Sequence, residues 1–479
     1  METDLILHLD ARHPGGLRAA VADAVRQAVL DGRLRADQRV PSSRSLAAAL
    51  GVSRGSVVAG IDQLVGEGYL VARARSGTVV APSVTSHPLR LEHRAVPANA
   101  ASTVPVLDLR PGIPSTRGVA GAEWRSAWRA AAAVDPPEDA ADPRGSAALR
   151  AQIADQLHRS RGVLAHADDV IVTSGTADAI EIVVRAVADP LDRPARVVVE
   201  DPGYPAVRRR LTRMGAVVIP VPVAGDGIDV ALLLALDPVP DVVVLTPSHQ
   251  YPTGGRLAAD ARLTLTDWAV AHGVLLVEDD YDSEFRHVGA PLPALAALDS
   301  SGAVVHVGSF SKTISPWLRM AFVVVRETSP LRGRIEAERG EDPSPVSGMV
   351  QLALSSYLAS GALRRHLARA RRAYAHRRRL LLDFFADVEW GSVSGLDGGL
   401  HAVVSLPAGV SAGDVVAELA VRGVLVASLD DYYANGRSPH PGLVLSYGGP
   451  GDLAVVRALE EVDAVVRAHG DRGIQGYAS

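Results

Sequence analysis

The sequence predicts an α/β protein preceded by a small, mostly helical module. From about residue 107 onward, apolar runs of strand length alternate with helical stretches, as in a mostly parallel sheet buried on both faces. Residues 1–81 instead show three helical stretches followed by two short alternating runs. Between them, residues 82–106 mix Pro, Ser, Ala and charged residues without a sustained period, which predicts an interdomain linker.

The composition describes an ordinary globular protein and excludes several classes. Hydrophobic residues make up 47% and charged residues 22% of the sequence, as in ordinary globular proteins. A chain of 479 residues is long enough for two or three domains. The absence of cysteine excludes disulfides and thiolate metal sites and suits a reducing cytoplasm, where we expect the protein. We expect neither a signal peptide nor a membrane-spanning helix, because no long charge-free apolar run is present. A net charge of -5 does not indicate nucleic-acid binding, although an average hides a small basic module.

The first module reads as a winged helix-turn-helix. "LRAAVADAVRQAVLDGRL" has apolar residues at helical spacing and ends its helix near Gly32. A second helix is predicted from Ser43 to Leu50, and Ser53 is a good N-cap for a third. "YLVARARSGTVVA" then alternates around "RSG", which predicts two strands joined by a tight turn.

The same module predicts a DNA interface. In a helix-turn-helix the second helix of the motif enters the major groove with its first residues leading, while the wing reaches backbone or minor groove. The predicted DNA contacts are Arg44, Ser53, Arg54, Ser56, Arg73, Arg75 and Gly77. Residues 1–80 hold 10 arginines against 8 acidic residues, so their net charge is small. The prediction of DNA binding therefore depends on where the arginines lie, not on the total charge. A winged helix used for protein contact is the alternative.

The module also carries a family resemblance. "VPSSRSLAAALGVSRGSVVAGIDQLVGEGYLVARARSGTVV", residues 40–80, is similar to the DNA-binding domain of the GntR family along nearly its whole length.

Polar, glycine-rich segments follow the apolar runs of the larger region, where the loops of a parallel sheet hold ligands. "TSGTADAI" offers backbone N–H groups at a helix start, which suits a phosphate. The others are "EDPGYP", "HQYPTGG", "VEDDYDSEF" and "GSFSKTISPWLRM". Taken singly, each is equally well explained as loop solvation or a helix cap.

Lys312, in the last of these segments, is the only lysine beside 48 arginines. Arginine stays protonated, whereas a partly buried lysine can lose its proton and attack a carbonyl. A surface lysine is the alternative explanation. A pyridoxal phosphate site needs such an amine, an acid against the pyridinium nitrogen and donors for the phosphate, and it uses an aromatic over the ring and a phenol near the ring oxygen. All five occur in these segments.

Their order resembles that of fold-type I, class I/II-like aminotransferases over roughly residues 107–470, with a smaller C-terminal α+β lobe from about 365 to 479. This lobe is introduced by the arginine-rich amphipathic helix "GALRRHLARARRAYAHRRRLLLDFF". The resemblance implies that Lys312 forms the Schiff base with pyridoxal phosphate, that Asp279 pairs with the ring nitrogen, that Tyr281 bonds the ring oxygen and that Tyr204 stacks on the ring. It implies phosphate contacts from Ser174, Gly175, Thr176, Ser309, Ser311 and Arg319.

A GntR-type winged helix, a linker and an aminotransferase-like domain (1–81, 82–106 and 107–479) together resemble the MocR subfamily of transcription regulators. "TPSHQYPTGG" and "VEDDYDSEFR" are similar to that subfamily's versions of the motifs. The resemblance implies a head-to-tail homodimer that holds pyridoxal phosphate, binds promoter DNA and regulates vitamin B6 or amino-acid genes.

Two departures from the aminotransferase pattern bear on mechanism. Tyr251 takes the place of the asparagine that contacts the ring oxygen, so we count it among the cofactor contacts. The segment "PGLVLSYGG" lacks the arginine that clamps a substrate carboxylate, and Arg437 is nearby only on an apparent loop.

Three functions therefore remain open at this stage. The first is a regulator whose DNA affinity depends on pyridoxal phosphate, or on an amine or amino acid that forms an aldimine with it. The second is a working aminotransferase with an accessory DNA-binding module, for which the missing carboxylate arginine is unfavourable. The third is a DNA-binding protein with a cofactor-free dimerisation domain, which the retained Lys312 disfavours.

Overall fold

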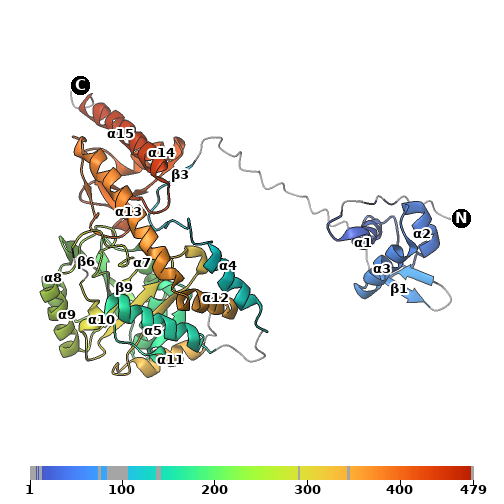
Figure 1. Ribbon diagram of the computed structural model, residues 1–479, viewed down its shortest axis with the longest axis horizontal. Coiled ribbons are helices and arrows are strands. Elements are labelled where there is room, and N and C mark those ends of the chain that lie inside the picture. Colours follow the sequence, from blue (N-terminus) through green and yellow to red (C-terminus); the bar gives the residue numbers. More distant parts are fainter. Residues whose placement is uncertain are drawn as a thin grey trace. The chain divides into compact units, whose positions relative to one another are not determined.

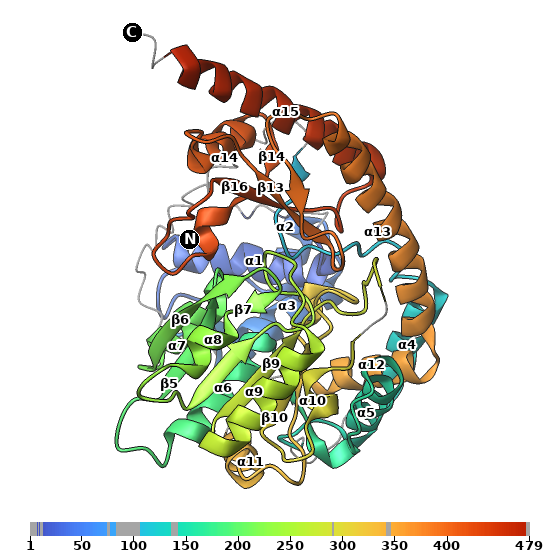
Figure 2. The same cartoon turned by 90° about the vertical axis from the view of Figure 1, so that its left-hand side faces the viewer.

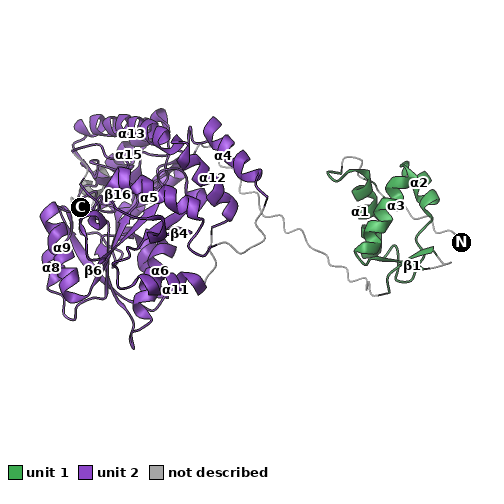
Figure 3. Ribbon diagram, turned by 60° about the horizontal axis from the view of Figure 1, so that its bottom comes forward, with its two compact units in different colours: residues 1–102 green, residues 103–479 purple. Residues whose placement is uncertain are grey.

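The computed structural model describes residues 7, 9, 13–73, 77–82, 106–135, 142–289, 292–341 and 346–475. The chain divides into two compact units, residues 1–102 and 103–479, which Figure 3 colours separately. The predicted linker lies outside the described residues except at its two ends, Pro82 and Val106.

The first unit is a winged helix-turn-helix, as predicted (Figure 1). Ser42 and Ser53 cap the second and third helices, each accepting a hydrogen bond from a backbone N–H three residues on. The two wing strands pair antiparallel, with Leu70 opposite Val80. The bounds of these elements are α1 (Gly16–Leu30), α2 (Ser43–Leu50), α3 (Arg54–Gly66), β1 (Leu70–Arg73) and β2 (Gly77–Val80).

Helices α1 and α3 pack closely because of one glycine. A Cβ at Gly60 would lie 3.0 Å from the Arg18 carbonyl oxygen and 3.1 Å from Val21 Cγ1. Buried Val21, Val25, Val57 and other apolar side chains surround this contact and form the core of the unit. The recognition helix is therefore fixed against α1 through its buried face, which leaves its first turn exposed.

The second unit is built on an eight-stranded sheet in the order β4-β11-β10-β9-β8-β5-β6-β7. Only β11 and β7 run antiparallel to their neighbours, so the sheet is mostly parallel, as the apolar runs predict. Its strands and the helices associated with them are β4 (Val170–Thr173), α6 (Thr176–Ala188), β5 (Arg196–Asp201), α7 (Pro205–Arg213), β6 (Val217–Ala224), β7 (Gly227–Ile228), α8 (Val230–Leu234), β8 (Val242–Leu245), α9 (Ala259–His272), β9 (Leu275–Asp280), α10 (Leu295–Leu298), β10 (Val304–Ser309), η2 (Pro316–Leu318), β11 (Ala321–Val324) and α11 (Arg332–Glu341).

Both faces of this sheet are covered, which explains why its strands are apolar at successive positions. Val197 and Val199 of β5 point into the core formed with α6 and α7, whereas Val198 between them belongs to the core on the other face. That second face is covered by α9 and α10, together with α5 (Ala147–Arg161) and α12 (Gly348–Ala359), as Figure 2 shows.

A smaller four-stranded antiparallel sheet, in the order β12-β13-β16-β15, forms the C-terminal lobe. The predicted arginine-rich helix is confirmed as α13, which packs on α12 at one end and on α15 at the other (Figures 1 and 2). The remaining elements are β3 (Leu107–Asp108), α4 (Ala122–Ala132), η1 (Ala167–Asp169), α13 (Ala362–Ala386), β12 (Val393–Ser394), β13 (His401–Ser405), α14 (Ala412–Val421), β14 (Val424–Leu425), β15 (Ala427–Ser428), η3 (Leu429–Tyr432), β16 (Gly442–Ser446) and α15 (Asp452–Gln475).

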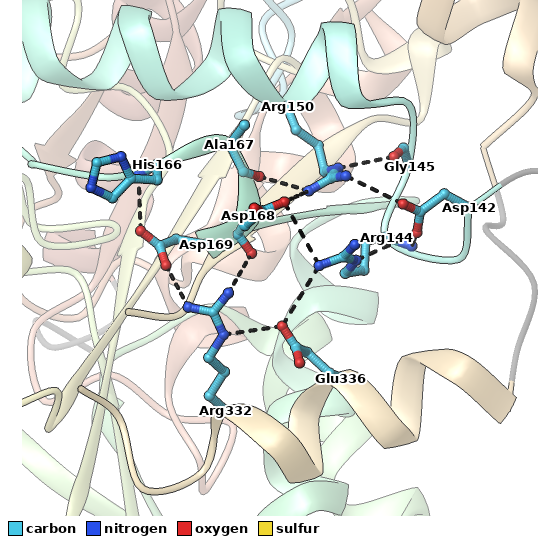
Figure 4. Close-up of polar contacts among 10 residues, drawn as sticks. All are labelled: Asp142, Arg144, Gly145, Arg150, His166, Ala167, Asp168, Asp169, Arg332 and Glu336. Carbon is cyan, nitrogen blue, oxygen red and sulfur yellow. Dashed lines mark hydrogen bonds and ion pairs between the residues drawn. The ribbon is translucent and has the colours of Figure 1, made fainter. Parts of the chain in front are cut away.

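A network of ion pairs joins helices from the two faces of the large sheet near the start of β4 (Figure 4). Arg150 of α5, only 3% exposed, donates to the carbonyl oxygens of Gly145 and Ala167 and to the Asp142 and Asp168 carboxylates. Arg332 of α11 donates to Asp169 and to the Asp168 carbonyl. The short η1 segment is therefore held from both sides.

We expect Arg150→Ala to lower the free energy of unfolding of the second unit by about 2–3 kcal/mol, because it leaves two carbonyls and part of the network unpaired. The matched control is Arg144→Ala in the same network, whose side chain is 32% exposed. That change should cost less than about 1 kcal/mol. Chemical unfolding followed by circular dichroism measures both free energies of unfolding. Equal losses of stability in the two variants would mean that burial of the Arg150 guanidinium does not determine its contribution.

Candidate functional site

A cavity of about 170 Å³ lies where β9 and β10 end and α6 begins. It gathers ten of the eleven predicted cofactor residues: Gly175, Thr176, Tyr204, Tyr251, Asp279, Tyr281, Ser309, Ser311, Lys312 and Arg319. The eleventh, Ser174, does not line the cavity, and its backbone N–H donates to the Asp178 carboxylate. The cavity is also lined by four residues that the sequence analysis does not include, Pro111, Gly112, Thr246 and Ala177.

One end of the cavity suits a phosphate. Gly175, the N-cap of the 13-residue helix α6, has φ +146°, and a Cβ there would lie 3.4 Å from Arg319 Nη2. The first turn of α6 presents backbone N–H groups beside this guanidinium. Ser309 and Ser311 add hydroxyl groups at the end of β10. A guanidinium, helix-start N–H groups and hydroxyls form a donor set for a dianion.

Lys312 is partly buried, and among the described residues its hydrogen-bond partner is a carbonyl rather than a carboxylate. Its Nζ donates to the carbonyl oxygen of Gly112 over 2.7 Å. Burial lowers the pKa of the Lys312 amine from its ordinary value, and the more distant Asp282 and Asp279 only partly oppose this. A lysine of lowered pKa is neutral more often, which is the form that attacks an aldehyde.

Asp279 supplies the clearest sign that a cation belongs in the cavity. Its Oδ1 is buried and has no hydrogen-bond partner among the described residues. Burial, together with the nearby Asp280 and Glu200 carboxyls, raises the pKa of this carboxyl to about 7, although Lys312 partly opposes them. A buried, unpartnered carboxyl is costly unless a ligand donates to it. The protonated nitrogen of a pyridine ring is such a donor, so the residues present fit pyridoxal phosphate.

Aromatic side chains form the opposite side of the cavity. Tyr204 is 45% exposed and meets Tyr251 edge-on, with ring centroids 5.8 Å apart. The Tyr251 hydroxyl lies 3.4 Å from that of Tyr432, which belongs to the smaller lobe. Burial raises the pKa of Tyr251 and Tyr281 well above the ordinary value, so both remain protonated donors at neutral pH. This part of the cavity thus combines the accessible ring of Tyr204 with the phenol groups of Tyr251 and Tyr281.

Two further residues behind these phenols are not among those predicted from the sequence. Tyr281 contacts His249, which in turn contacts Asp282, and both partners are buried. His249 lies in the segment "HQYPTGG" and Asp282 in "VEDDYDSEF". The sequence therefore shows both residue types but not that the two side chains meet. Gly112 offered no signal, because 200 positions separate it from Lys312.

In the first unit, the predicted DNA residues lie at the starts of α2 and α3 and in the wing. Arg44 and Arg54 are exposed, and Arg54 Nε donates to Ser43 Oγ at 3.3 Å. Ser53 and Ser56 bond to each other at the helix start. The predicted contact Arg75 lies outside the described residues.

Two wing residues have partners within the unit. Arg73 pairs with Asp37 at 2.7 Å, with both side chains about half exposed. Gly77 has φ +82°, and a Cβ there would meet the guanidinium of Arg39 at 3.0 Å. Arg39, which the sequence analysis does not include, is exposed and forms a β-bridge with Val79, so it is a further cation of the wing.

Comparison with known protein families gives two matches. The family "Aminotransferase class I and II" matches residues 122–433, and the family "Bacterial regulatory proteins, gntR family" matches residues 17–80. Among solved structures, a kynurenine aminotransferase from Pyrococcus horikoshii covers 76% of this chain and 92% of its own, with a TM-score of 0.68 and 23% identity. LysN, the α-aminoadipate aminotransferase of Thermus thermophilus, crystallised with N-(5'-phosphopyridoxyl)-L-leucine, has a TM-score of 0.66 and 25% identity over the same shares.

Relatives with both units are also found. The pyridoxine biosynthesis transcriptional regulator PdxR of Corynebacterium glutamicum is 38% identical over 97% of this chain and 99% of its own. The probable rhizopine catabolism regulatory protein MocR of Rhizobium meliloti is 31% identical over 93% and 92%. Fold and matches define a DNA-binding transcription regulator with a domain of the pyridoxal phosphate-dependent aminotransferase class. Within that class, the chain belongs to the MocR subfamily of GntR-family regulators.

No helix in the described part of the chain has the length and apolar character needed to cross a membrane.

Proposed function

We propose that this regulator binds promoter DNA with an affinity set by pyridoxal phosphate in the cavity around Lys312, and that it controls vitamin B6 supply. The observation that carries the proposal is the joint presence of a partly buried amine, an unpartnered buried carboxyl and a phosphate-type donor set in one cavity of a DNA-binding chain. The name of the Corynebacterium glutamicum relative, which refers to pyridoxine biosynthesis, supports the choice of pathway. Genes of amino-acid metabolism are the alternative targets.

Each cavity residue has a role in this proposal. Bound pyridoxal phosphate would supply an aldehyde that condenses with an amine. Lys312 would offer that amine, and Asp279 would hold a proton on the pyridine nitrogen. Tyr204 would stack on the ring, while Tyr251 and Tyr281 would present hydroxyls to its oxygen. The first turn of α6 would hold the phosphate together with Ser309, Ser311 and Arg319.

The surroundings of the cavity favour the cofactor itself as the signal over an amino acid. Arg319 is the only arginine among the described residues that line the cavity, and in this proposal it is taken up by the phosphate. Arg208 of α7 donates to the carbonyl oxygens of Tyr432 and Tyr433 in the smaller lobe. Arg437 is exposed on its loop. A substrate carboxylate would therefore lack the bidentate partner that it needs.

We further propose that the protein works in the cytoplasm as a head-to-tail homodimer, which would present two recognition helices to one promoter. Trp317, between Lys312 and Arg319, is 93% exposed, and exposed tryptophans beside a site are typical anchors of protein interfaces. Sedimentation analysis should give twice the chain mass, and Trp317→Ser should shift the protein toward monomer.

The proposal is tested with the purified full chain and DNA fragments that it selects from a random-sequence library. We expect a visible absorption band from the bound cofactor and a change in DNA affinity of at least about tenfold when pyridoxal phosphate is added. A colourless protein would exclude the cofactor, and DNA binding indifferent to pyridoxal phosphate and to amines would exclude the sensor. Rapid consumption of an amino donor would instead support the alternative, a working aminotransferase with an accessory DNA-binding module.

The recognition helix gives a separate prediction. Arg54→Ala should weaken binding to the selected DNA by about 10- to 100-fold, because it removes an exposed guanidinium at the leading end of α3. The absorption band should be unchanged. Arg26→Gln is a matched control, since Arg26 pairs with Glu67 just beyond the other end of α3. Equal loss from both changes would mean that the recognition helix is misassigned.

A further inference from the structure

His249 is the centre of a buried hydrogen-bonded group behind the cavity. Its Nδ1 lies 3.0 and 3.1 Å from the two carboxylate oxygens of Asp282 and 3.0 Å from the hydroxyl oxygen of Tyr281. Its Nε2 lies 3.4 Å from the carbonyl oxygen of Gly395. His249 is 5% exposed and Asp282 1%. One ring nitrogen thus faces a carboxylate and a phenol at the same time.

The types of these groups decide which of them donates. An ionised carboxylate only accepts, so the proton between His249 and Asp282 must sit on Nδ1. A protonated Nδ1 cannot accept from the phenol, so the Tyr281 oxygen can only accept from it. Among the described residues, this contact is the only hydrogen bond recorded for the Tyr281 hydroxyl, and the residue lines the cavity. Its proton is therefore available to a ligand there.

Other ionisable groups around the ring do not reverse this assignment. Burial lowers the pKa of His249, but the Asp282 charge and hydrogen bond outweigh it and raise the pKa above its ordinary value. His401, whose ring centroid is 5.1 Å away, has a pKa lowered well below the ordinary value by burial, and its Nε2 meets the Pro252 carbonyl. The other charged or titratable groups near His249 are His287, Arg161, Arg256, Arg262 and Arg286.

The backbone holds the pair in place. Gly399 has φ +68°, and a Cβ there would overlap Asp282 Oδ2 and lie 2.5 Å from His249 Cε1. The adjacent Gly398 has an ordinary φ, and a Cβ there would only touch His249 Cδ2 at 3.5 Å. The chain therefore tolerates a side chain at one of these glycines and not at the other.

We propose that Asp282 and His249 are positioning residues that fix the Tyr281 hydroxyl as a donor into the cavity, toward the ring oxygen of pyridoxal phosphate. The inference rests on the proposed cofactor. Without Asp282, Nδ1 could lose its proton and become an acceptor, and the phenol would turn its proton to His249 instead of the ligand. The pair would thus act on the cofactor only through Tyr281.

This arrangement predicts a spectroscopic effect. A donor to the ring oxygen stabilises that oxygen's negative charge, which favours loss of the neighbouring proton at the lysine linkage. Removing the donor should raise the pH at which the visible band of the bound cofactor changes by about one unit. We expect this shift for Tyr281→Phe, for His249→Phe and for Asp282→Asn, each measured by absorbance over pH on the full-length protein with pyridoxal phosphate.

The double variant is the decisive comparison. If His249 acts through the phenol, His249→Phe should add no further shift once Tyr281 is phenylalanine. His249→Asn should restore the wild-type pH, because its amide N–H occupies the place of Nδ1–H. Gly399→Ala should reproduce the shift and Gly398→Ala should not. The asparagine and glycine variants keep the test informative if the phenylalanine variant is unstable.

The outcomes separate this inference from the function on which it rests. A wild-type protein without a visible band overturns both. A wild-type band together with unchanged titration in His249→Phe and Asp282→Asn overturns only the positioning role. Additive shifts in the double variant also overturn it, because His249 would then act on the cofactor by another route.

Discussion

Lys312→Ala should yield a colourless protein whose affinity for pyridoxal phosphate falls by at least about 100-fold, because the covalent attachment is lost. The experiment is unusually clean in this chain, since position 312 holds the only lysine and no second ε-amine can take its place. Absorbance and equilibrium dialysis measure the change. The affinity for DNA should then no longer depend on the cofactor.

Lys312→Arg is the matched control for this result. It retains a positive charge beside the Gly112 carbonyl but offers no neutral amine. We expect it to be colourless as well. Cofactor attached covalently to either variant, detected by reduction with borohydride followed by mass spectrometry, would contradict the assignment of Lys312.

Asp279→Asn should stabilise the cofactor-free protein while weakening cofactor binding. The pKa of Asp279 is about 7 in the folded chain, against 3.8 as its ordinary value. A carboxyl whose pKa is raised by folding costs stability as pH rises between those two values. The asparagine variant should therefore equal the wild type near pH 4 and exceed it above pH 7, by up to about 4 kcal/mol. Thermal unfolding across pH measures this difference.

Glu200→Gln separates the two effects of Asp279. Burial also raises the pKa of Glu200 to about 7, but Glu200 does not line the cavity. The glutamine variant should gain stability above pH 7 and still bind pyridoxal phosphate. Asp279→Asn should lose about 10- to 100-fold in cofactor affinity through the missing charged hydrogen bond. If Asp279→Asn bound the cofactor as tightly as the wild type, the pairing with the ring nitrogen would be wrong.

Helices and strands could be predicted from the sequence wherever the residues that determine them are adjacent in the chain. Ser53 and the apolar spacing after it are enough to begin α3 at Arg54, because an N-cap and its helix are adjacent in the chain. The apolar runs likewise predict strands such as β9, since burial on both faces leaves few polar positions. The candidate cofactor residues could be predicted because they lie in the segments that follow strands or open helices, where a parallel sheet places its ligands.

Contacts between distant segments could not be predicted in the same way. Nothing in the spacing joins Gly112 to Lys312, or His249 to Asp282, because these pairs depend on the order of strands in the sheet. Ser174 is a different case: it directly precedes α6 as expected, but its backbone N–H donates to the Asp178 carboxylate and the residue does not line the cavity. Which atom of a loop faces a cavity is decided by backbone angles that residue types do not fix.

The position of β3 has a practical consequence for dissecting the protein. Leu107 and Leu109 pair with the Gly423 and Leu425 carbonyls of the smaller lobe, and only three residues later Gly112 receives the Lys312 amine. A fragment meant to isolate the second unit must therefore start no later than Val106. Starting at Ile113 would free one edge of the smaller lobe and leave the reactive amine without its resting partner, so such a fragment would report misleading cofactor chemistry.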